Sequence, residues 1–306
     1  MSTPKPFRSG FVTLVGRPNT GKSTLVNALV GRKVAAVTPH PQTTRTHLLG
    51  VLHTPGAQAV FVDTPGIHRG RGPLARELAR SVCAALEGRD LSLFVRDVSR
   101  PWGSEDAQAL ELLRGEATPP VFLVLNKIDR LPRLRALLPI IAAERERYRF
   151  AEVVPVSALR RLRLDDLLRL VVAALPEGPE YFPSGQSTDQ PEQFWISEII
   201  REQAMLATHA EVPHALAVQV EADRRVRSRG VPLRVLEAVL ICERESQKAI
   251  LVGRGGAMIR RIGTAARQQL ETALQSRVLL KLQVLVRGGW REDAGAVANL
   301  DFHHMG

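Results

Sequence analysis

The first 175 residues alternate short apolar runs with longer stretches in which apolar residues recur at helical spacing. Continuous apolar runs are typical of strands buried on both faces of a sheet, and amphipathic stretches are typical of the helices that cover them. The expected strands are 11–15, 47–53, 58–62, 91–95, 121–125 and 152–156. The expected helices are 22–30, 73–87, 104–114, 134–147 and 162–174. The pattern therefore predicts an α/β domain with a mostly parallel sheet and helices on both faces.

One pair of expected strands departs from the parallel pattern. The strands 47–53 and 58–62 are separated only by Thr54-Pro-Gly-Ala, which is typical of a hairpin turn. We therefore expect one edge of the sheet to be antiparallel.

Residues 176–193 contain four prolines and two glycines and almost no aliphatic side chains. This composition is typical of a linker. It separates an expected nucleotide-binding domain at 8–175 from a second domain at 194–306. The second domain begins with a helix at 194–207. It continues with strands 214–221 and 235–242, a glycine-rich turn, a helix and a strand at 278–286, which predicts a smaller α+β domain.

Composition narrows the class of protein. The chain has 306 residues, of which 44% are hydrophobic, and this content excludes a disordered protein. Lys and Arg number 42 against 31 Asp and Glu, a formal net charge of +11 that favours a polyanionic partner. The basic residues concentrate in 1–50 and 254–291. The chain has two isolated cysteines and does not begin with an apolar leader, which argues against a secreted protein. No run approaches the ~20 apolar residues of a membrane span, which argues against a membrane-spanning protein.

The segment Gly16–Ser23 matches the phosphate-loop pattern G-x-x-x-x-G-K-S between an expected strand and an expected helix. Gly16 and Gly21 allow backbone N–H groups to wrap phosphate oxygens at a helix N-terminus. Lys22 supplies a positive charge to the β- and γ-phosphates, and Ser23 a hydroxyl to Mg²⁺. The residues assigned to this nucleotide-binding loop are Gly16, Arg17, Pro18, Asn19, Thr20, Gly21, Lys22, Ser23 and Thr24.

A second nucleotide motif, Asp63-Thr64-Pro65-Gly66, follows the strand 58–62. Asp63 suits the Mg²⁺ shell through water, and the N–H of Gly66 suits the γ-phosphate. A turn that merely ends a strand would have the same composition. Its position as the next motif after a phosphate loop favours the nucleotide site.

The base is indicated by Asn126-Lys-Ile-Asp129 and by Ser157-Ala158, each of which follows an expected strand. The Asp129 carboxylate is a paired acceptor for the N1–H and 2-amino groups of guanine, which adenine lacks. Asn126 would brace the base loop, the Lys127 stem would cover the ring, and the Ala158 N–H would reach guanine O6. All motifs come in order at the carboxyl ends of strands, where α/β sheets bind ligands. The predicted nucleotide is GTP or GDP.

The catalytic residues are less fully determined. One of Thr43 and Thr44 should reach Mg²⁺, and we favour Thr44, although a polar turn explains either threonine taken separately. Ile67 stands where many regulatory GTPases carry a water-orienting Gln, so intrinsic hydrolysis should be slow. Asn19 either ligates a monovalent cation such as K⁺ beside the phosphates or only shapes the loop. The predicted catalytic set is Lys22, Asn19, Thr44 and Gly66, and the predicted Mg²⁺ set is Ser23, Thr44 and Asp63.

The second domain carries its own candidate site, Val252-Gly-Arg-Gly-Gly256. A G-x-x-G turn allows a nucleic-acid backbone to approach closely, while helix N–H groups and arginines meet its phosphates. An ordinary turn is the alternative, and the basic bias of 254–291 favours RNA. Because aromatic residues are sparse here, we expect an apolar groove that grips a few single-stranded nucleotides. The predicted RNA-binding residues are Gly253, Arg254, Gly255, Gly256, Arg260 and Arg261.

Over nearly its whole length the chain resembles the Era family of bacterial GTPases. The segments that carry the resemblance are GRPNTGKST (16–24), PQTTR (41–45), DTPGI (63–67), NKID (126–129), SAL (157–159), EIIRE (198–202) and SQKAILVGRGGAMIRRIG (246–263). The last is similar to the type II KH signature. Arg254 and Arg260 replace lysines common in relatives. Arg96 replaces a more usual apolar residue and could disturb its strand.

The resemblance implies a Ras-like P-loop GTPase domain followed by a type II KH domain. It further implies Mg²⁺-dependent GTP hydrolysis, binding of the 3′ end of 16S rRNA through the KH domain, and a role in assembly of the 30S ribosomal subunit. GTP would order the loops 38–46 and 63–72 and thereby gate RNA binding. We expect a cytoplasmic monomer with peripheral association at the inner membrane.

Three alternatives remain at this stage. The chain could be an RNA-binding scaffold that holds GTP structurally with negligible hydrolysis, which the apolar Ile67 favours. It could be a membrane-remodelling GTPase, although the long helical stalk expected of that class is missing. It could be a tRNA-modification GTPase, against which the Gly253–Gly256 turn argues.

Overall fold

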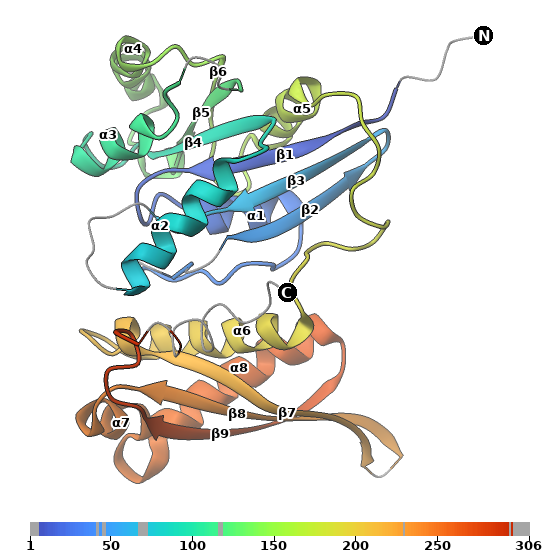
Figure 1. The fold of residues 1–306 in the computed structure, drawn as a ribbon, viewed down its shortest axis with the longest axis vertical. Helices are drawn as coiled ribbons and strands as arrows, with labels where there is room; N and C mark the ends of the chain where they lie inside the picture. Colours follow the sequence, from blue (N-terminus) through green and yellow to red (C-terminus); the bar gives the residue numbers. More distant parts are fainter. Residues whose placement is uncertain are drawn as a thin grey trace. The chain divides into compact units, whose positions relative to one another are not determined.

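The structure is a computed structural model, and it describes residues 6–40, 43–44, 47–66, 73–115, 119–228, 230–293 and 295. Contacts between Cα atoms divide the chain into two compact units. The second unit contains the described residues from Gln190 onward together with those of Ala36–Arg45 and Gly70–Glu77, and the first unit contains the other described residues up to Asp189 (Figure 1).

The first unit is built on a six-stranded sheet in the order β2-β3-β1-β4-β5-β6. The strands are β1 Arg8–Val15, β2 Leu48–Thr54, β3 Ala57–Asp63, β4 Leu91–Asp97, β5 Val121–Asn126 and β6 Glu152–Pro155. All neighbouring pairs are parallel except β2 with β3. The predicted antiparallel edge and the predicted α/β class are therefore confirmed, and the carboxyl ends of the parallel strands share one edge of the sheet.

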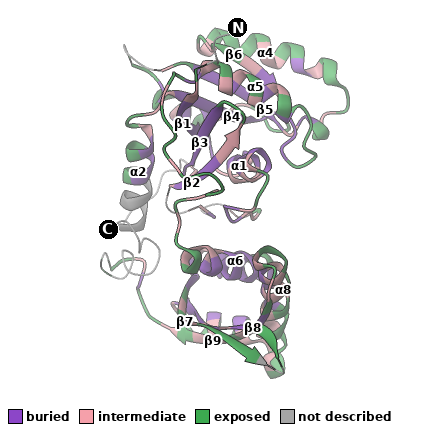
Figure 2. Ribbon diagram, turned by 90° about the vertical axis from the view of Figure 1, so that its right-hand side faces the viewer, coloured by how far each residue is buried: buried purple, intermediate pink, exposed green. Residues whose placement is uncertain are grey.

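Helices cover both faces of this sheet (Figures 1 and 2). The helices are α1 Lys22–Val30, α2 Pro73–Leu86, α3 Ser104–Glu111, α4 Leu137–Arg147 and α5 Leu164–Ala174. Apolar side chains of α1 and α5 form one buried cluster with the strands, and those of α3 and α4 form another. The sheet itself is buried on both sides, which explains its continuous apolar runs.

The segment predicted as a linker makes defined contacts with the first unit. The Gln58 side chain on β3 accepts the backbone N–H of Tyr181 at 2.8 Å and donates to the carbonyl of Phe182 at 2.8 Å. The N–H of Val51 on β2 donates to the carbonyl of Ser187 at 2.9 Å. Residues 181–187 thus lie along the β2–β3 edge, and the domain boundaries 8–175, 176–193 and 194–306 remain a proposal.

Arg96 is accommodated within β4 without interrupting that strand. The side chain is 4% exposed, and its Nε donates to Glu144 Oε1 on α4 at 3.1 Å. Its Nη1 donates to the carbonyls of Asp97 and Arg100 at 2.7 and 3.0 Å. Burial raises the pKa of Glu144, and the charge of Arg96 opposes that rise. The expectation that Arg96 could disturb the strand is wrong because a buried carboxylate compensates its charge.

This ion pair gives a stability prediction. Glu144→Ala leaves the Arg96 guanidinium buried without its counter-charge, and we expect the free energy of unfolding to fall by about 3–5 kcal/mol. Replacing both residues by leucine removes both charges and should recover most of the loss. Denaturant unfolding followed by tryptophan fluorescence measures both variants. A Glu144→Ala loss below about 1 kcal/mol would show that the pair is effectively solvated.

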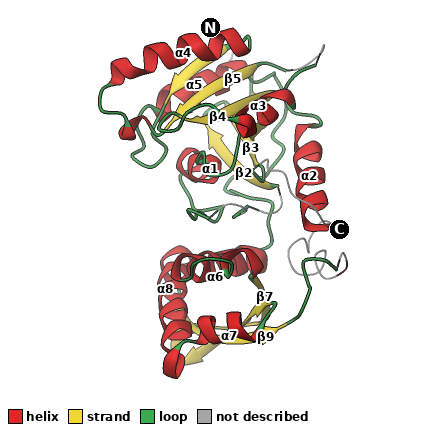
Figure 3. Ribbon diagram, turned by 90° about the vertical axis from the view of Figure 1, so that its left-hand side faces the viewer, coloured by secondary structure: helices red, strands yellow, loops and turns green. Residues whose placement is uncertain are grey.

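The second unit contains a three-stranded sheet in the order β7-β8-β9, with helices packed on one face (Figure 3). The elements are α6 Glu192–Ala207, β7 Ala217–Ser228, β8 Val231–Cys242, α7 Glu245–Val252, α8 Ala257–Leu274 and β9 Arg277–Val286. Strands β7 and β8 are antiparallel, whereas β8 and β9 are parallel. The predicted α+β class of this domain is confirmed.

Two features of the second unit were not predicted. The strand β7 continues beyond residue 221 through a charged stretch that alternation of apolar residues does not mark. Helix α7 was missed because its four apolar residues, 249–252, are consecutive and show no helical period. Its start is fixed by Gln247, whose side-chain oxygen accepts the N–H groups of Glu243 and Arg244 at 2.9 and 3.2 Å.

No helix within the described residues is both long enough and apolar enough to cross a lipid bilayer.

Candidate functional site

The phosphate loop connects β1 to α1 at the carboxyl edge of the sheet. Gly21 directly precedes α1 with φ +97°, and Asn19 has φ +62°. A Cβ at Gly16 would lie 2.4 Å from the carbonyl oxygen of Val95 on β4. Positive φ angles and close approach to a neighbouring strand are the conditions that favour glycine, so the loop geometry follows from its sequence.

Lys22 is held inside this loop. Its side chain is 6% exposed, and Nζ donates to the carbonyls of Gly16 and Arg17 at 2.9 and 3.2 Å. Burial lowers its pKa to about 8, and the nearby Asp63 carboxylate partly opposes the shift. The ammonium group is therefore positioned at the loop centre before any phosphate binds there.

The motif Asp63–Gly66 lies against the phosphate loop. Asp63 is fully buried, and the hydroxyl of Thr64 donates to the carbonyl of Leu14 on β1 at 2.6 Å. A Cβ at Gly66 would lie 2.6 Å from the Pro18 Cα, so only glycine allows this approach. The structure thus brings the second motif onto the first.

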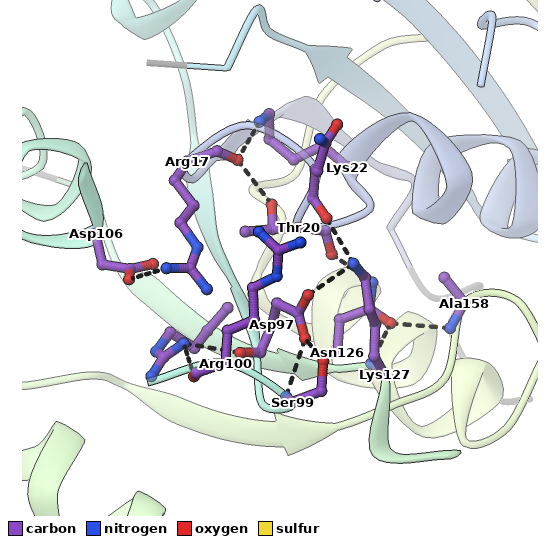
Figure 4. A network of polar contacts seen from close by, with 12 residues as sticks. Arg17, Thr20, Lys22, Asp97, Ser99, Arg100, Asp106, Asn126, Lys127 and Ala158 are labelled. Carbon is purple, nitrogen blue, oxygen red and sulfur yellow. Dashed lines mark hydrogen bonds and ion pairs between the residues drawn. The ribbon is translucent and has the colours of Figure 1, made fainter. Parts of the chain in front are cut away.

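Asn126 connects the base loop to the phosphate loop (Figure 4). Its Nδ2 donates to the carbonyl of Thr20 at 2.9 Å. Its Oδ1 accepts the N–H groups of Lys127 and Ala158 at 2.8 and 3.0 Å. One buried amide therefore joins three of the predicted motifs, and the bracing geometry expected of Asn126 is present.

The N–H of Ala158 donates to Asn126 Oδ1 at 3.0 Å, which holds the second base loop against the first. The hydroxyl of the neighbouring Ser157 donates to Asp129 Oδ1 and accepts the N–H of Arg160 at 3.1 Å. The Ser157 hydroxyl therefore orients the Asp129 carboxylate, and the contact of the Ala158 N–H with guanine O6 stays a prediction.

Lys127 is held between two loops. Its Nζ donates to the carbonyl of Asn19 at 2.6 Å and to Asp97 Oδ2, at the end of β4, at 2.7 Å. The other oxygen of Asp97 accepts the N–H and the hydroxyl of Ser99 at 2.9 and 2.6 Å (Figure 4). Despite burial, these contacts hold the pKa of Asp97 below its usual value. The Nζ end of Lys127 is thus fixed between the phosphate loop and the end of β4.

Arg17 directs its side chain away from the phosphate loop. Its Nη1 forms an ion pair with Asp106 Oδ2 on α3 at 3.0 Å, and both residues are buried. Only the backbone of Arg17 therefore suits a phosphate contact. The hydroxyl of Thr20 likewise donates back to the Arg17 carbonyl at 3.1 Å, which stabilises the loop from within.

The predicted Mg²⁺ ligands in the first unit are Ser23 and Asp63. Ser23 lies in the first turn of α1, directly after Lys22, and Asp63 supplies a buried carboxylate near that lysine. Hydroxyl and carboxylate oxygens are the donors that Mg²⁺ prefers, so this donor set fits the ion. Thr44 belongs to the second unit, so its role as a Mg²⁺ ligand stays a prediction. Ile67 lies outside the described residues.

The turn of the second unit has the backbone that its glycines predict. Gly253, Gly255 and Gly256 have φ angles of +72°, +56° and +77°. A Cβ at Gly253 would lie 2.8 Å from Met258 Cβ, and Arg254 is exposed at the tip of the turn. Gly256 precedes α8, so the N-terminal N–H groups of that helix face the turn.

A groove of about 440 Å³ begins at this turn and runs between α8 and β9. The residues that line it are Gly256, Ile259, Arg260, Gly263, Thr264, Arg267, Leu279, Leu280 and Leu282. Its walls combine aliphatic side chains with two arginines, one of which, Arg267, is paired with Glu271 at 2.7 Å. Arg261 is exposed on α8 but does not line the groove. An apolar groove of the predicted kind is present.

Comparison with known proteins agrees with both halves of the chain. Residues 11–127 match the family model described as 50S ribosome-binding GTPase, and residues 211–291 match the KH domain model. GTPase Era of Geobacter metallireducens is 44% identical over 297 residues, which are 97% of this chain and 98% of the relative. The chain belongs to the Era family of GTPases. Era of Lacticaseibacillus paracasei is 42% identical over 96% of this chain and 97% of that protein.

Solved Era structures have the same fold. Aquifex aeolicus Era in a complex with GDP and AlF4⁻ superimposes with a TM-score of 0.89 at 35% identity, covering 95% of this chain and 98% of that one. Era in complex with MgGDPNP and nucleotides 1506–1542 of 16S ribosomal RNA superimposes equally well, at 35% identity over 95% and 97% of the two chains. The predicted Ras-like GTPase domain followed by a KH domain is confirmed.

Several residues that shape this Era site were not found from the sequence. Asp97 and Asp106 fix Lys127 and Arg17 from other elements, and Gly263 keeps the groove open beside Leu282. Each acts across a long sequence separation and forms no local motif. The end of β4 is the only signal that marks Asp97, because ligand sites gather at carboxyl ends of strands.

Proposed function

We propose that this chain is a GTP-hydrolysing switch that binds the 3′ end of 16S rRNA through its KH groove and acts in assembly of the 30S subunit. The observation that carries the nucleotide half is the single amide of Asn126, which bonds to the phosphate loop and to both base loops. Membership of the Era family supports the activity, because its members are GTPases.

The proposed reaction is attack of water on the γ-phosphate of GTP. Lys22 and the loop N–H groups hold the β- and γ-phosphates, and the N–H of Gly66 donates to the γ-phosphate oxygen that gains charge. Bound Mg²⁺ would neutralise phosphate charge at the Ser23 hydroxyl and the Asp63 carboxylate. The guanine would lie along the Lys127 stem with its N1–H and 2-amino groups directed to Asp129.

GTP turnover with and without a 3′-end 16S rRNA oligonucleotide, in potassium and in sodium buffer, tests this proposal. Stimulation by RNA would join the two domains into one switch, and a potassium requirement would place Asn19 beside the phosphates. Slow turnover that no condition changes would favour the alternative, an RNA-binding scaffold that holds GTP structurally.

The RNA half of the proposal rests on the turn and groove of the KH domain. Backbone N–H groups at the start of α8 and the exposed Arg254 suit phosphate oxygens, and the groove suits unstacked bases. Arg260 lines the groove, which supports its proposed contact with the same RNA segment. Solved Era with 16S rRNA nucleotides supports this assignment.

Gly256 offers a charge-specific test of the RNA site. A Cβ there meets nothing closer than Ile259 Cγ2 at 3.9 Å, and Asp and Asn both tolerate its positive φ. We expect Gly256→Asp to weaken RNA binding at least about tenfold more than the isosteric Gly256→Asn, because its carboxylate repels phosphate. Fluorescence anisotropy with the oligonucleotide measures both, and GDP affinity serves as the control. Equal loss in both variants would show that shape rather than charge governs the turn.

The proposal extends to a monomer in the cytoplasm that contacts the inner membrane peripherally. The formal net charge of +11 supports attraction to anionic lipid headgroups. Co-sedimentation with anionic and with neutral vesicles, and sedimentation equilibrium for the mass, test these two points.

A further inference from the structure

The segment between α1 and β2 is the first switch loop predicted from the sequence, yet its described residues pack on the KH domain. Residues 36–40, 43 and 44 belong to the second unit. Two consecutive side chains of α6, Arg201 and Glu202, bind this segment near its two ends. Both lie in the EIIRE motif of 198–202, to which the nucleotide and RNA sites assign no role.

Arg201 binds the C-terminal end of the described segment. It is 2% exposed, and its Nη2 donates to the carbonyl oxygen of Thr43. Its Nε and Nη2 also donate to Glu198 Oε1 and Oε2 at 2.7 and 2.6 Å. A bidentate pair fixes the plane of a guanidinium, so Glu198 orients Arg201 toward the segment.

Glu202 binds the N-terminal end. It is 3% exposed, and its Oε2 accepts the backbone N–H of Val37 at 3.0 Å. Its other oxygen accepts Gln203 Nε2 at 3.4 Å. Both α6 residues therefore contact backbone atoms, and the contact depends on the path of the segment rather than on its side chains.

The segment between these two contacts is internally bonded. The hydroxyls of Thr38 and Thr43 are 2.6 Å apart, and the Thr43 hydroxyl donates to the carbonyl of His40 at 2.8 Å. The N–H of His40 donates to the Thr38 hydroxyl at 3.1 Å. Hydrogen bonds thus connect Thr38, His40 and Thr43, the described residues that lie between or at the two α6 contacts.

Helix α6 in turn contacts the groove helix. Its buried isoleucines, Ile196, Ile199 and Ile200, share one apolar cluster with Ile262, Ala266 and Leu270 of α8. The groove is lined from the same helix by Arg260, Gly263 and Arg267. A continuous packed path within one unit therefore joins the switch segment to the RNA groove.

We propose that Arg201 and Glu202 are positioning residues that clamp the switch segment to the KH domain and thereby couple the bound nucleotide to RNA affinity. This inference rests on the proposed function. Thr44 would supply its hydroxyl to Mg²⁺ beside a γ-phosphate, and the tethered segment would move with it. Helix α6 must then follow or lose both hydrogen bonds, so the free energy of the RNA site depends on the nucleotide. By linkage, RNA must change the affinity for GTP by the same factor.

Two measurements on the full chain test the clamp. The first is hydrogen exchange of the Val37 amide, which Glu202→Ala should accelerate and Glu202→Gln should leave protected, because an amide oxygen still accepts its N–H. The second is the ratio of RNA dissociation constants with GDP and with a non-hydrolysable GTP analogue. We expect a ratio of about 5–150 for the unmodified chain and within about twofold of one for Arg201→Ala and Glu202→Ala.

The controls separate this inference from the proposed function. Gln193→Ala, at an exposed position on the same helix, should keep both the ratio and the Val37 protection. Circular dichroism reports whether each variant folds. If Arg201→Ala does not fold, the comparison of Glu202→Ala with Glu202→Gln still tests the clamp. A chain that binds neither GTP nor RNA contradicts the proposed function. A chain that binds both with a ratio of one, or variants that retain a large ratio, overturn the clamp.

Discussion

Lys22→Ala should reduce GTP turnover by about 10²–10³-fold or more, because it removes a charge aimed at the phosphate oxygens that develop charge in the transition state. The ammonium is buried and held by the Gly16 and Arg17 carbonyls, so its charge is fixed at the phosphate loop. Single-turnover kinetics with saturating GTP measures the loss. The matched control is Arg32→Ala, which removes an exposed cation just beyond α1. Retention of turnover in Lys22→Ala would contradict the assigned site.

The same lysine gives a pH dependence. Burial lowers its pKa to about 8 from 10.5, so the nucleotide-free chain loses this proton as pH rises through 8. Bound phosphates favour the charged ammonium, so nucleotide binding above pH 8 takes up a proton and affinity falls as pH rises. The free energy of unfolding of the chain without nucleotide changes with pH in the opposite direction. Between pH 8 and pH 10.5 the unfolded state binds more protons at Lys22 than the folded state does, so the contribution of Lys22 to stability rises with pH. Calorimetry in buffers of different ionisation enthalpy detects the proton uptake, which Lys22→Ala should abolish.

Local patterns predicted most of the site because its motifs are local. The phosphate loop needs only a strand, a turn that glycine allows and a helix, and all three are consecutive in 8–30. The contacts that lock those motifs are long-range and were not predictable. Asp97 lies 30 residues before Lys127, and Arg201 lies 158 residues after Thr43. A single sequence contains no periodicity that relates such pairs.

One error of prediction shows the same limit of local patterns. Arg96 was expected to disturb its strand, but Glu144 on α4, 48 residues later, compensates its charge. The local polar group was interpreted without the partner that tertiary packing supplies.

Asp129→Asn should shift base preference from guanine to xanthine. The Asp129 carboxylate is oriented by the Ser157 hydroxyl and would accept the N1–H and 2-amino groups of guanine. The amide oxygen still accepts the Ser157 hydroxyl and the N1–H of the base, but the NH₂ group then faces the 2-amino group of guanine, donor against donor. Xanthine carries an oxygen in place of the 2-amino group and accepts that NH₂. Because a site that leaves buried polar groups unpaired rejects its ligand strongly, we expect selectivity for GTP over XTP to fall by about 10⁴-fold.

Competition of GTP and XTP for a fluorescent guanine nucleotide measures this change, and Ser157→Ala separates orientation from base reading. That variant removes the hydroxyl but keeps the carboxylate, so it should weaken GTP binding while guanine remains the preferred base. Asp165→Asn, an exposed carboxylate in the first turn of α5, is the neutral control for loss of charge. If Asp129→Asn left GTP over XTP selectivity unchanged, the base would be read elsewhere and the NKID assignment would be wrong. If base selectivity shifts in Asp129→Asn but not in Ser157→Ala or Asp165→Asn, the Asp129 side chain contacts the base directly, because the other two variants keep its carboxylate.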